Sequence, residues 1–207
     1  MGVMLSSSVI TRFCSAAAVL LAVFTVACSG QPSGPSNAAT SSAQRCTKGD
    51  NLLLATDFMR VPEQRYPWRG FQHARRSFSV DVDDGVLTVT QIASEPWFYF
   101  AQSLKDTGLA GRTVEFSADL KGNIIAEPKF HAWDHVGGLY YSVKKGRERL
   151  NTRIAEHEPN QGEWDWQRVS VEFTVPEDAT ELLVGFTHQA KGWFKARNPS
   201  LRVIECR

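Results

Sequence analysis

The sequence lacks a surplus of charge of either sign, and this limits the partners of its folded part. The chain carries 23 Lys and Arg residues against 22 Asp and Glu residues. Arg12 is the one charged residue among positions 1–44, so the remainder carries 22 charges of each sign. A neutral domain lacks the basic surface that binds phosphate backbones. The composition therefore argues against nucleic-acid binding.

The sequence also lacks helical periodicity and catalytic motifs. No stretch shows apolar residues at helical spacing over more than two turns, and no nucleophile motif, phosphate loop or metal signature is present. His131 and His135 stand four apart, a spacing that converges on a helix but not on a strand and turn. We therefore expect no bound metal. An enzyme that uses His131, Asp134, Glu156 and His157 for acid–base chemistry remains an alternative.

Long apolar runs are scarce, and the one at residues 13–27 is short. Fifteen residues are few for a membrane-spanning helix but typical of the hydrophobic region of a signal peptide. The run ends in TVACS, which resembles the lipobox of bacterial lipoproteins, although Thr25 stands where that motif usually has Leu. The resemblance implies a signal peptide over residues 1–27 and acylation of Cys28, for example with palmitate. An ordinary secretory signal, with Cys28 left as a free thiol, stays open.

The residues after Cys28 predict a flexible tether. Positions 29–44 are rich in small residues and Pro and carry no charge, so residues 28–45 bury too little apolar surface to fold. Two or more acyl chains on Cys28 would anchor the chain stably. We expect a lipid-anchored protein of the cell envelope that contacts the membrane only through its lipid. By resemblance to lipoprotein sorting, Ser29 favours the outer membrane if the organism is Gram-negative.

The chain has few cysteines, and their positions differ in meaning. Cys14 leaves with the signal peptide, whereas Cys46 and Cys206 lie at the two ends of the predicted domain, residues 46–207. Exported proteins fold in oxidising compartments, and the termini of a domain often lie close together. We predict a Cys46–Cys206 disulfide. Two free thiols, or a bridge to a partner, remain open.

What the folded part does have is the alternation of β-strands. Val169, Val171 and Phe173 alternate with polar residues, and Pro176 begins a turn before a second apolar strand over residues 182–186. Further strands are predicted over residues 77–82, 86–92, 97–104, 112–121, 129–134, 139–144 and 193–205, with a β-leaning run at 49–58. Residues 146–162 look like a charged excursion. Nine to eleven short strands in all predict an all-β, antiparallel β-sandwich.

Four segments carry a family resemblance. In chain order they are NLLLATDF, AGRTVEFSADLKG, GEWDWQRVSVEFTVPEDATELLVGF and WFKARNPSLRVIE. Their order and spacing resemble the jelly-roll carbohydrate-binding modules of the cellulose- and xylan-binding kind, within the galactose-binding-like superfamily, over Asn51 to Glu205. The resemblance implies a jelly-roll fold and a polysaccharide or oligosaccharide ligand.

Such modules often hold a structural calcium near their termini, using an acidic residue soon after the first strand. Here Asp57 is acidic, but Met59 stands where the family commonly has Glu. Arg197 and Asn198 replace the usual acidic pair near the end. We therefore expect no cofactor, with calcium doubtful.

Sugar recognition in these modules places aromatic rings against pyranose rings, so the aromatic residues that face away from the core are candidate ligands. In residues 97–104, Phe98 and Phe100 suit the core, which leaves Trp97 and Tyr99 on the other face. The same alternation over two more predicted strands completes the candidate set: Trp97, Tyr99, His131, Trp133 and Tyr140. The opposite orientation, with some of these side chains in the core, stays open for each.

Two other interpretations remain. A structural role, in which the domain binds another envelope protein and no small ligand, would need none of these aromatic residues. Residues 144–153 carry five positive charges and one negative charge. Such a run is usually a solvated loop, but it also suits contact with an acidic polysaccharide or lipid headgroups.

Overall fold

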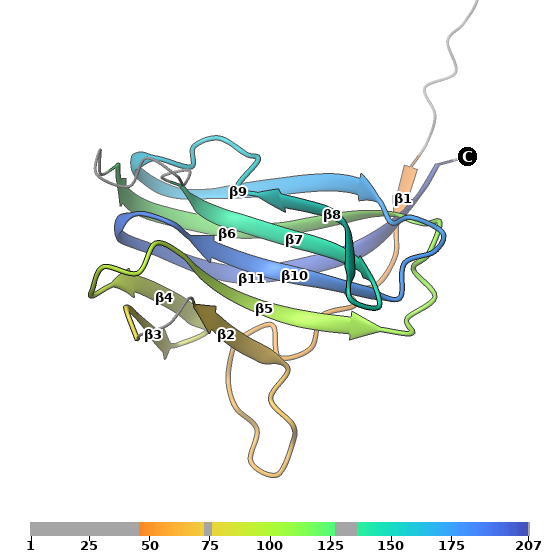
Figure 1. The fold of residues 1–207 in the computed structure, drawn as a ribbon, viewed down its shortest axis with the longest axis horizontal. Coiled ribbons are helices and arrows are strands. Elements are labelled where there is room, and N and C mark those ends of the chain that lie inside the picture. The colour runs from red at the N-terminus through yellow and green to blue at the C-terminus, as the bar shows by residue number, and fades with distance from the viewer. Residues whose placement is uncertain (1–45, 73–75, 127–135, 207) are drawn as a thin grey trace, which may run out of the picture. The chain divides into compact units, whose positions relative to one another are not determined.

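The computed structural model describes residues 46–72, 76–126 and 136–206, and these fold as β-structure (Figure 1). The strands are β1 (Cys46–Lys48), β2 (Trp68–Gln72), β3 (Phe78–Asp83), β4 (Val86–Gln91), β5 (Phe98–Lys105), β6 (Thr113–Ile125), β7 (Gly137–Lys145), β8 (Glu148–Ile154), β9 (Gly162–Thr174), β10 (Glu181–His188) and β11 (Lys191–Cys206). In these three ranges there is no helix, and hence none able to cross a membrane.

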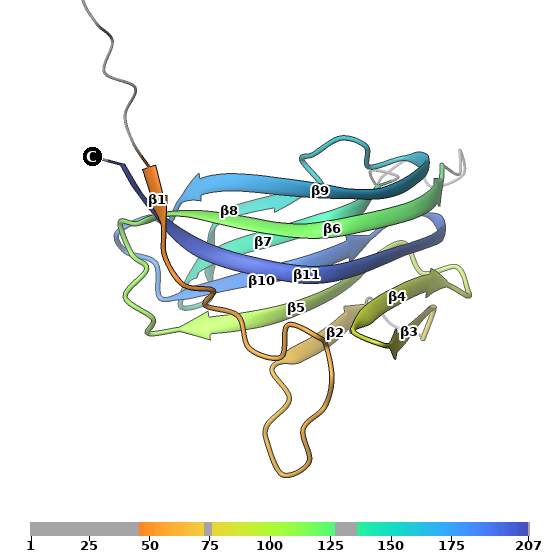
Figure 2. The same cartoon turned by 180° about the vertical axis from the view of Figure 1, so that it is seen from behind.

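The strands form two antiparallel sheets that pack face to face, as Figures 1 and 2 show from opposite sides. The six-stranded sheet has the order β3-β4-β11-β6-β9, with β1 also paired to β11. The five-stranded sheet has the order β2-β5-β10-β7-β8. Neighbours in space are mostly distant in sequence, as in a jelly roll. The predicted antiparallel β-sandwich is confirmed.

The core lies between the sheets and is built from alternate residues of each strand. Among its fully buried large side chains are Trp68, Phe116, Leu120, Phe186 and Phe194. In β9 the predicted alternation holds: Val169 and Phe173 are buried, while Ser170 faces solvent. Burial of about 25 cal/mol per Å² of apolar surface, summed over such a core, is the main stabilising contribution.

The predicted hairpin at residues 77–92 is also confirmed. β3 and β4 pair in register from Phe78 opposite Gln91 to Asp83 opposite Val86. Asp84 and Gly85 make the turn with φ angles of +45° and +72°. Aspartate and glycine tolerate this left-handed region, so the sequence Asp-Gly determines where the strand reverses.

The β-leaning run at residues 49–58 does not form a strand, which corrects the sequence-based expectation. It follows β11 only briefly, through Gly49 N to Val203 O and Leu52 N to Leu201 O, both 2.9 Å. Ala55 and Phe58 then have φ angles of +45° and +58°, incompatible with a strand. The left-handed turn lets the Phe58 ring enter the core, where it is 1% exposed.

The charged segment at residues 146–162 also differs from the sequence-based expectation, because it contains a strand. β8 pairs with β7 and forms one edge of the five-stranded sheet. Edge strands commonly carry charged side chains, which discourage pairing with other chains. That composition hides the strand pattern. The strand predicted at 129–134 lies outside the described residues.

Candidate functional site

Three aromatic residues gather on the outer face of the five-stranded sheet, which we call the aromatic strip: Trp97, Tyr99 and Tyr140. Trp97 immediately precedes β5, and its ring centroid lies 5.1 Å from that of Tyr99. The Tyr99 ring stacks on that of Tyr140 at 4.3 Å. The alternation of β5 explains the orientation, because Phe98 and Phe100 occupy the core face. The predicted outward direction of Trp97 and Tyr99 agrees with this geometry.

Small and buried residues support the strip. Ala101 and Leu183 form a small apolar cluster with Tyr140 on the outer face, and Tyr99 packs against it. Gln189, which follows β10, donates its Nε2–H to the Tyr99 hydroxyl at 3.0 Å. Burial raises the pKa of Tyr99 to about 12, and the neighbouring Tyr140 adds to the rise. Tyr99 is therefore a neutral phenol in a fixed position.

Tyr140 lies on the predicted face but is less accessible than expected. Its side chain is 6% exposed because Tyr99 and Ile154 pack against it. Burial also raises the pKa of Tyr140. Because the Tyr140 ring is buried, it supports the Tyr99 ring and offers little surface to a ligand. The accessible aromatic surface of the strip therefore belongs to Trp97 and Tyr99.

Sequence reasoning missed Phe71 as a neighbour of the strip. The β2–β5 register places Phe71 directly opposite Tyr99, on the same face of the sheet, and its side chain is 44% exposed. Side chains at directly opposed positions lie within contact distance. The segment at residues 60–76 is rich in polar residues and Pro and shows no alternation, so no sequence signal identified Phe71.

The remaining candidates divide into two groups. His131 and Trp133, with Asp134 and His135, lie outside the described residues. Of the residues weighed for acid–base chemistry, His157 accepts the Leu139 N–H through Nε2 at 3.0 Å, and burial lowers its pKa to about 4. Glu156 pairs with Arg153 at 3.2 Å. The His157 bond ties β7 to the segment that follows β8, whereas the Glu156 pair lies within β8 and that segment.

The residues present do not fit a structural calcium. Asp57 accepts the backbone N–H of Met59 at 3.0 Å and so completes its own turn. Arg197 and Asn198 both direct nitrogen atoms at Asp119, at 3.6 and 2.8 Å. Calcium requires several oxygen ligands and is disfavoured by a guanidinium. In the described ranges no group of three His, Cys, Asp or Glu residues could hold a metal ion.

The basic stretch at residues 144–153 lies in the β7–β8 hairpin, where carboxylates neutralise part of it. Lys144 lies 3.9 Å from Glu181, and Lys145 lies 3.1 Å from Asp178. Exposed pairs of this kind contribute little stability, about 0–1 kcal/mol each. They do reduce the positive charge that the stretch presents to a ligand.

The fold is that of jelly-roll carbohydrate-binding modules. The CBM22-1 xylan-binding domain of Paenibacillus barcinonensis Xyn10C superimposes with a TM-score of 0.50 at 16% identity, covering 75% of this chain and 95% of that domain. The CBM22-1–CBM22-2 tandem domain of the same protein gives a TM-score of 0.52 at 18% identity, covering 79% of this chain and 47% of the tandem. No family model and no curated protein matches the sequence. At these identities the likeness shows the fold.

Proposed function

We propose that the protein is a lipoprotein of the cell envelope whose β-sandwich binds a polysaccharide or oligosaccharide without catalysing a reaction. The aromatic strip carries this proposal: Trp97 and Tyr99 lie side by side on the outer face of a sheet, supported by Tyr140. Aromatic rings on a rigid sheet provide the apolar surface that the C–H face of a pyranose buries. The fold shared with a xylan-binding domain adds support.

The expected affinity is modest. Stacking a few aromatic rings on sugars must offset the desolvation of hydroxyl groups and the loss of ligand rotation. We expect dissociation constants from about micromolar to millimolar, or roughly −8 to −4 kcal/mol. The neutral, fixed Tyr99 phenol suits an uncharged glycan.

A glycan array probed with the full chain in detergent tests the proposal, followed by titration of the best ligand. Trp97→Ala and Tyr99→Ala should each weaken binding about tenfold or more, since each removes a stacking surface. Trp193→Ala is the matched control, because Trp193 is a partly exposed tryptophan on β11 of the other sheet. Equal binding by all three variants would show that the strip is not the site.

Assembly with another envelope protein is a second candidate function. It is favoured by apolar side chains on the segment that extends from the sandwich between β1 and β2 (Figure 1). Leu54, Met59 and Val61 are 67%, 49% and 51% exposed. Exposed apolar residues that cluster often mark protein contacts. Absence of glycan binding, together with an envelope partner lost on substitution of Leu54 and Val61 by Ser, would favour this function.

A further inference from the structure

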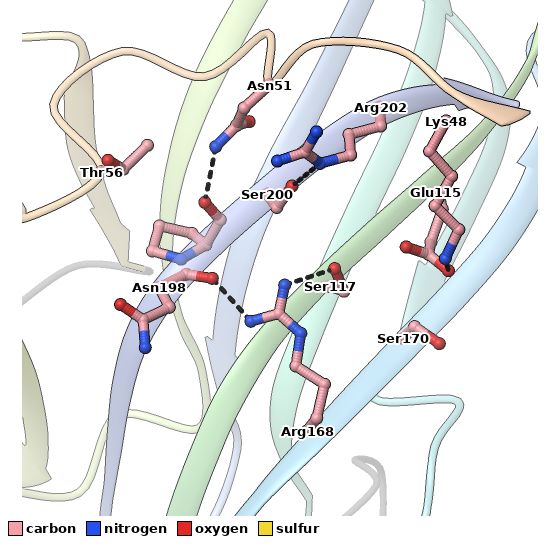
Figure 3. A pocket seen from close by; sticks show the side chains of 11 residues that line it. Lys48, Asn51, Thr56, Glu115, Ser117, Arg168, Ser170, Asn198, Ser200 and Arg202 are labelled. Carbon is pink, nitrogen blue, oxygen red and sulfur yellow. Dashed lines mark hydrogen bonds and ion pairs between the residues drawn. The ribbon is translucent and has the colours of Figure 1, made fainter.

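A hollow lies on the outer face of the six-stranded sheet, on the opposite side of the sandwich from the aromatic strip. It has a volume of about 650 Å³ and extends across β9, β6 and β11 beneath the segment that follows β1 (Figure 3). Its lining is polar. Arg168 comes from β9, Ser117 from β6, Arg202 from β11, and Asn51 from the covering segment. We call it the polar hollow.

An irregularity in β11 shapes the polar hollow. The register between β11 and β6 shifts between Arg197 and Ser200, and Asn198 has a φ of +52°. The carbonyl oxygen of Pro199 then accepts the Asn51 Nδ2–H at 3.0 Å, which ties the covering segment to the sheet. Bulges that redirect side chains are common beside functional sites.

Arg168 is held in one position at the floor of the hollow. Its Nη1 donates to the Asn198 carbonyl at 2.7 Å, and its Nη2 donates to Ser117 Oγ at 2.8 Å. Asp119 lies 3.1 Å from Nη1, and its own pKa is lowered because hydrogen bonds from Asn198 and Arg168 outweigh the effect of burial. A guanidinium fixed in this way needs little ordering to bind a ligand.

Arg202 supplies a second fixed guanidinium on the other side of β6. Its Nε donates to Ser200 Oγ at 2.9 Å and its Nη1 to the Gly49 carbonyl at 2.8 Å. Nη2 takes part in neither bond. Figure 3 shows the guanidinium groups of Arg202 and Arg168 both reaching the hollow, from strands on either side of Ser117. In the described part of the chain Arg202 forms no ion pair.

The charges of the lining leave a positive excess. Lys48 and Glu115 neutralise one another at 2.6 Å. Asp119 is shared by two guanidinium groups, those of Arg168 and Arg197, at 3.1 and 3.6 Å. Together with Arg202, this concentrates positive charge in one place on a chain that is otherwise close to neutral. Paired arginines with a planar fork are suited to carboxylate and similar oxyanions.

We propose that the polar hollow binds the carboxylate group of an acidic polysaccharide, such as a uronic acid residue. The two guanidinium groups would bind the carboxylate. Ser170 would meet a hydroxyl of the ring, because it lines the same hollow and is exposed. No aromatic residue and no large aliphatic residue belongs to the described lining, which disfavours a lipid chain. This site is independent of the aromatic strip in both position and ligand chemistry.

Titration of the full chain with the hexamer of galacturonic acid at low ionic strength tests the proposal. Arg168→Gln and Arg202→Gln should each weaken binding at least tenfold. Lys121→Gln should change it less than twofold, since Lys121 lies on β6 outside the hollow and pairs with Asp165 at 2.8 Å. The methyl-esterified hexamer has the same size but no charge, and it should not bind. Added salt should weaken binding of the acid form.

Ser170→Glu provides a variant that leaves the arginine hydrogen bonds intact, since Ser170 is exposed at the hollow. It should abolish binding by repulsion while leaving the unfolding temperature unchanged. Equal binding of the methyl ester, or unaltered binding by Arg168→Gln and Ser170→Glu, would overturn the proposal. So would binding only of inorganic phosphate, or only of phosphatidylglycerol vesicles. Tyr99→Ala should leave this binding intact, which separates it from failure of the aromatic strip.

Discussion

Tyr99 and Tyr140 stack across β10, with ring centroids 4.3 Å apart, although they belong to strands that do not pair with each other. The residues of β10 between them are Thr187, opposite Tyr99, and Gly185, opposite Tyr140. Gly185 lets β10 lie close to β5, because a Cβ there would collide with the backbone of Phe100 and Ala101. The Tyr140 ring is buried and the Tyr99 ring is partly exposed, so one ring presents its surface while the other supports it.

This division of roles predicts different effects for substitutions at the two positions. Tyr140→Ala removes a buried ring and should lower the free energy of unfolding by about 3–5 kcal/mol. Tyr140→Phe keeps the packing and should cost less than about 1.5 kcal/mol. Urea denaturation of both variants measures the difference. A Tyr140→Ala protein as stable as Tyr140→Phe would contradict the packing described for this ring.

The β1–β11 register supports a second prediction, the Cys46–Cys206 disulfide. The two residues are direct partners in an antiparallel pair, and Cα atoms so paired lie about 4.5–5.5 Å apart, within reach of a disulfide. Closing a loop of about 160 residues should stabilise the fold by roughly 4–5 kcal/mol. Mass mapping of non-reduced peptides should find the two cysteines joined. Free thiols in protein from its native compartment would contradict the prediction.

The third prediction concerns the anchor. Lipid on Cys28 should direct the protein to the membrane fraction, since two or more acyl chains give stable anchoring. Cys28→Ala should shift it to the soluble fraction. Ser29→Ala alters the next residue without removing the thiol, so it serves as the control for membrane association. Undiminished membrane association of Cys28→Ala would argue against lipidation.

Two histidines predict a loss of stability in mild acid. Burial lowers the pKa of His188 to about 4, where its ring packs between Phe78 and Phe194, and the pKa of His157 is also about 4. An unfolded histidine binds its proton near pH 6.5, so the unfolded state holds more protons between about pH 6.5 and 4. Stability present above pH 6.5 should therefore fall as the pH drops through this window. The loss should be about 2 kcal/mol per histidine between pH 7.5 and 5.

Urea midpoints of the natural chain, His157→Gln and His188→Gln at pH 7.5 and 5 measure this effect. Each variant should lose less stability on acidification than the natural chain. His157 offers a specific mechanism, because a proton on Nε2 would break the hydrogen bond from the Leu139 N–H. An identical pH dependence in all three proteins would place the acid sensitivity elsewhere.

The sequence predicts the strands where alternation is strong and fails where tertiary contacts decide. β9 and β10 follow from their period of two, and the β3–β4 turn follows from Asp84-Gly85. β8 is not predicted, because the charges typical of an edge strand obscure its alternation. The run before Phe58 is wrongly predicted as a strand, because its apolar residues enter the core from a left-handed turn. Local patterns cannot report either effect.

The same distinction applies to the candidate sites. Trp97 and Tyr99 are predictable because orientation within one strand depends only on alternation. Burial of Tyr140 depends on a ring from another strand, and Phe71 depends on register. The polar hollow has no sequence signal, because Asn51, Arg168 and Arg202 meet only through the shifted register of β11.

The pairing of β1 with β11 has a mechanical consequence. A pull on the chain ahead of Cys46 would load a strand of three residues, which can peel from its neighbour one hydrogen bond at a time. A covalent link to Cys206 would bypass this weak seam and transfer the force directly to β11. β6 pairs with that strand between Lys191 and Val203, and β4 pairs with it from Trp193 to Ala196, so the force would spread as shear across the six-stranded sheet. If fluid flow pulled on the tethered protein, the sandwich would then unfold only when many hydrogen bonds break together.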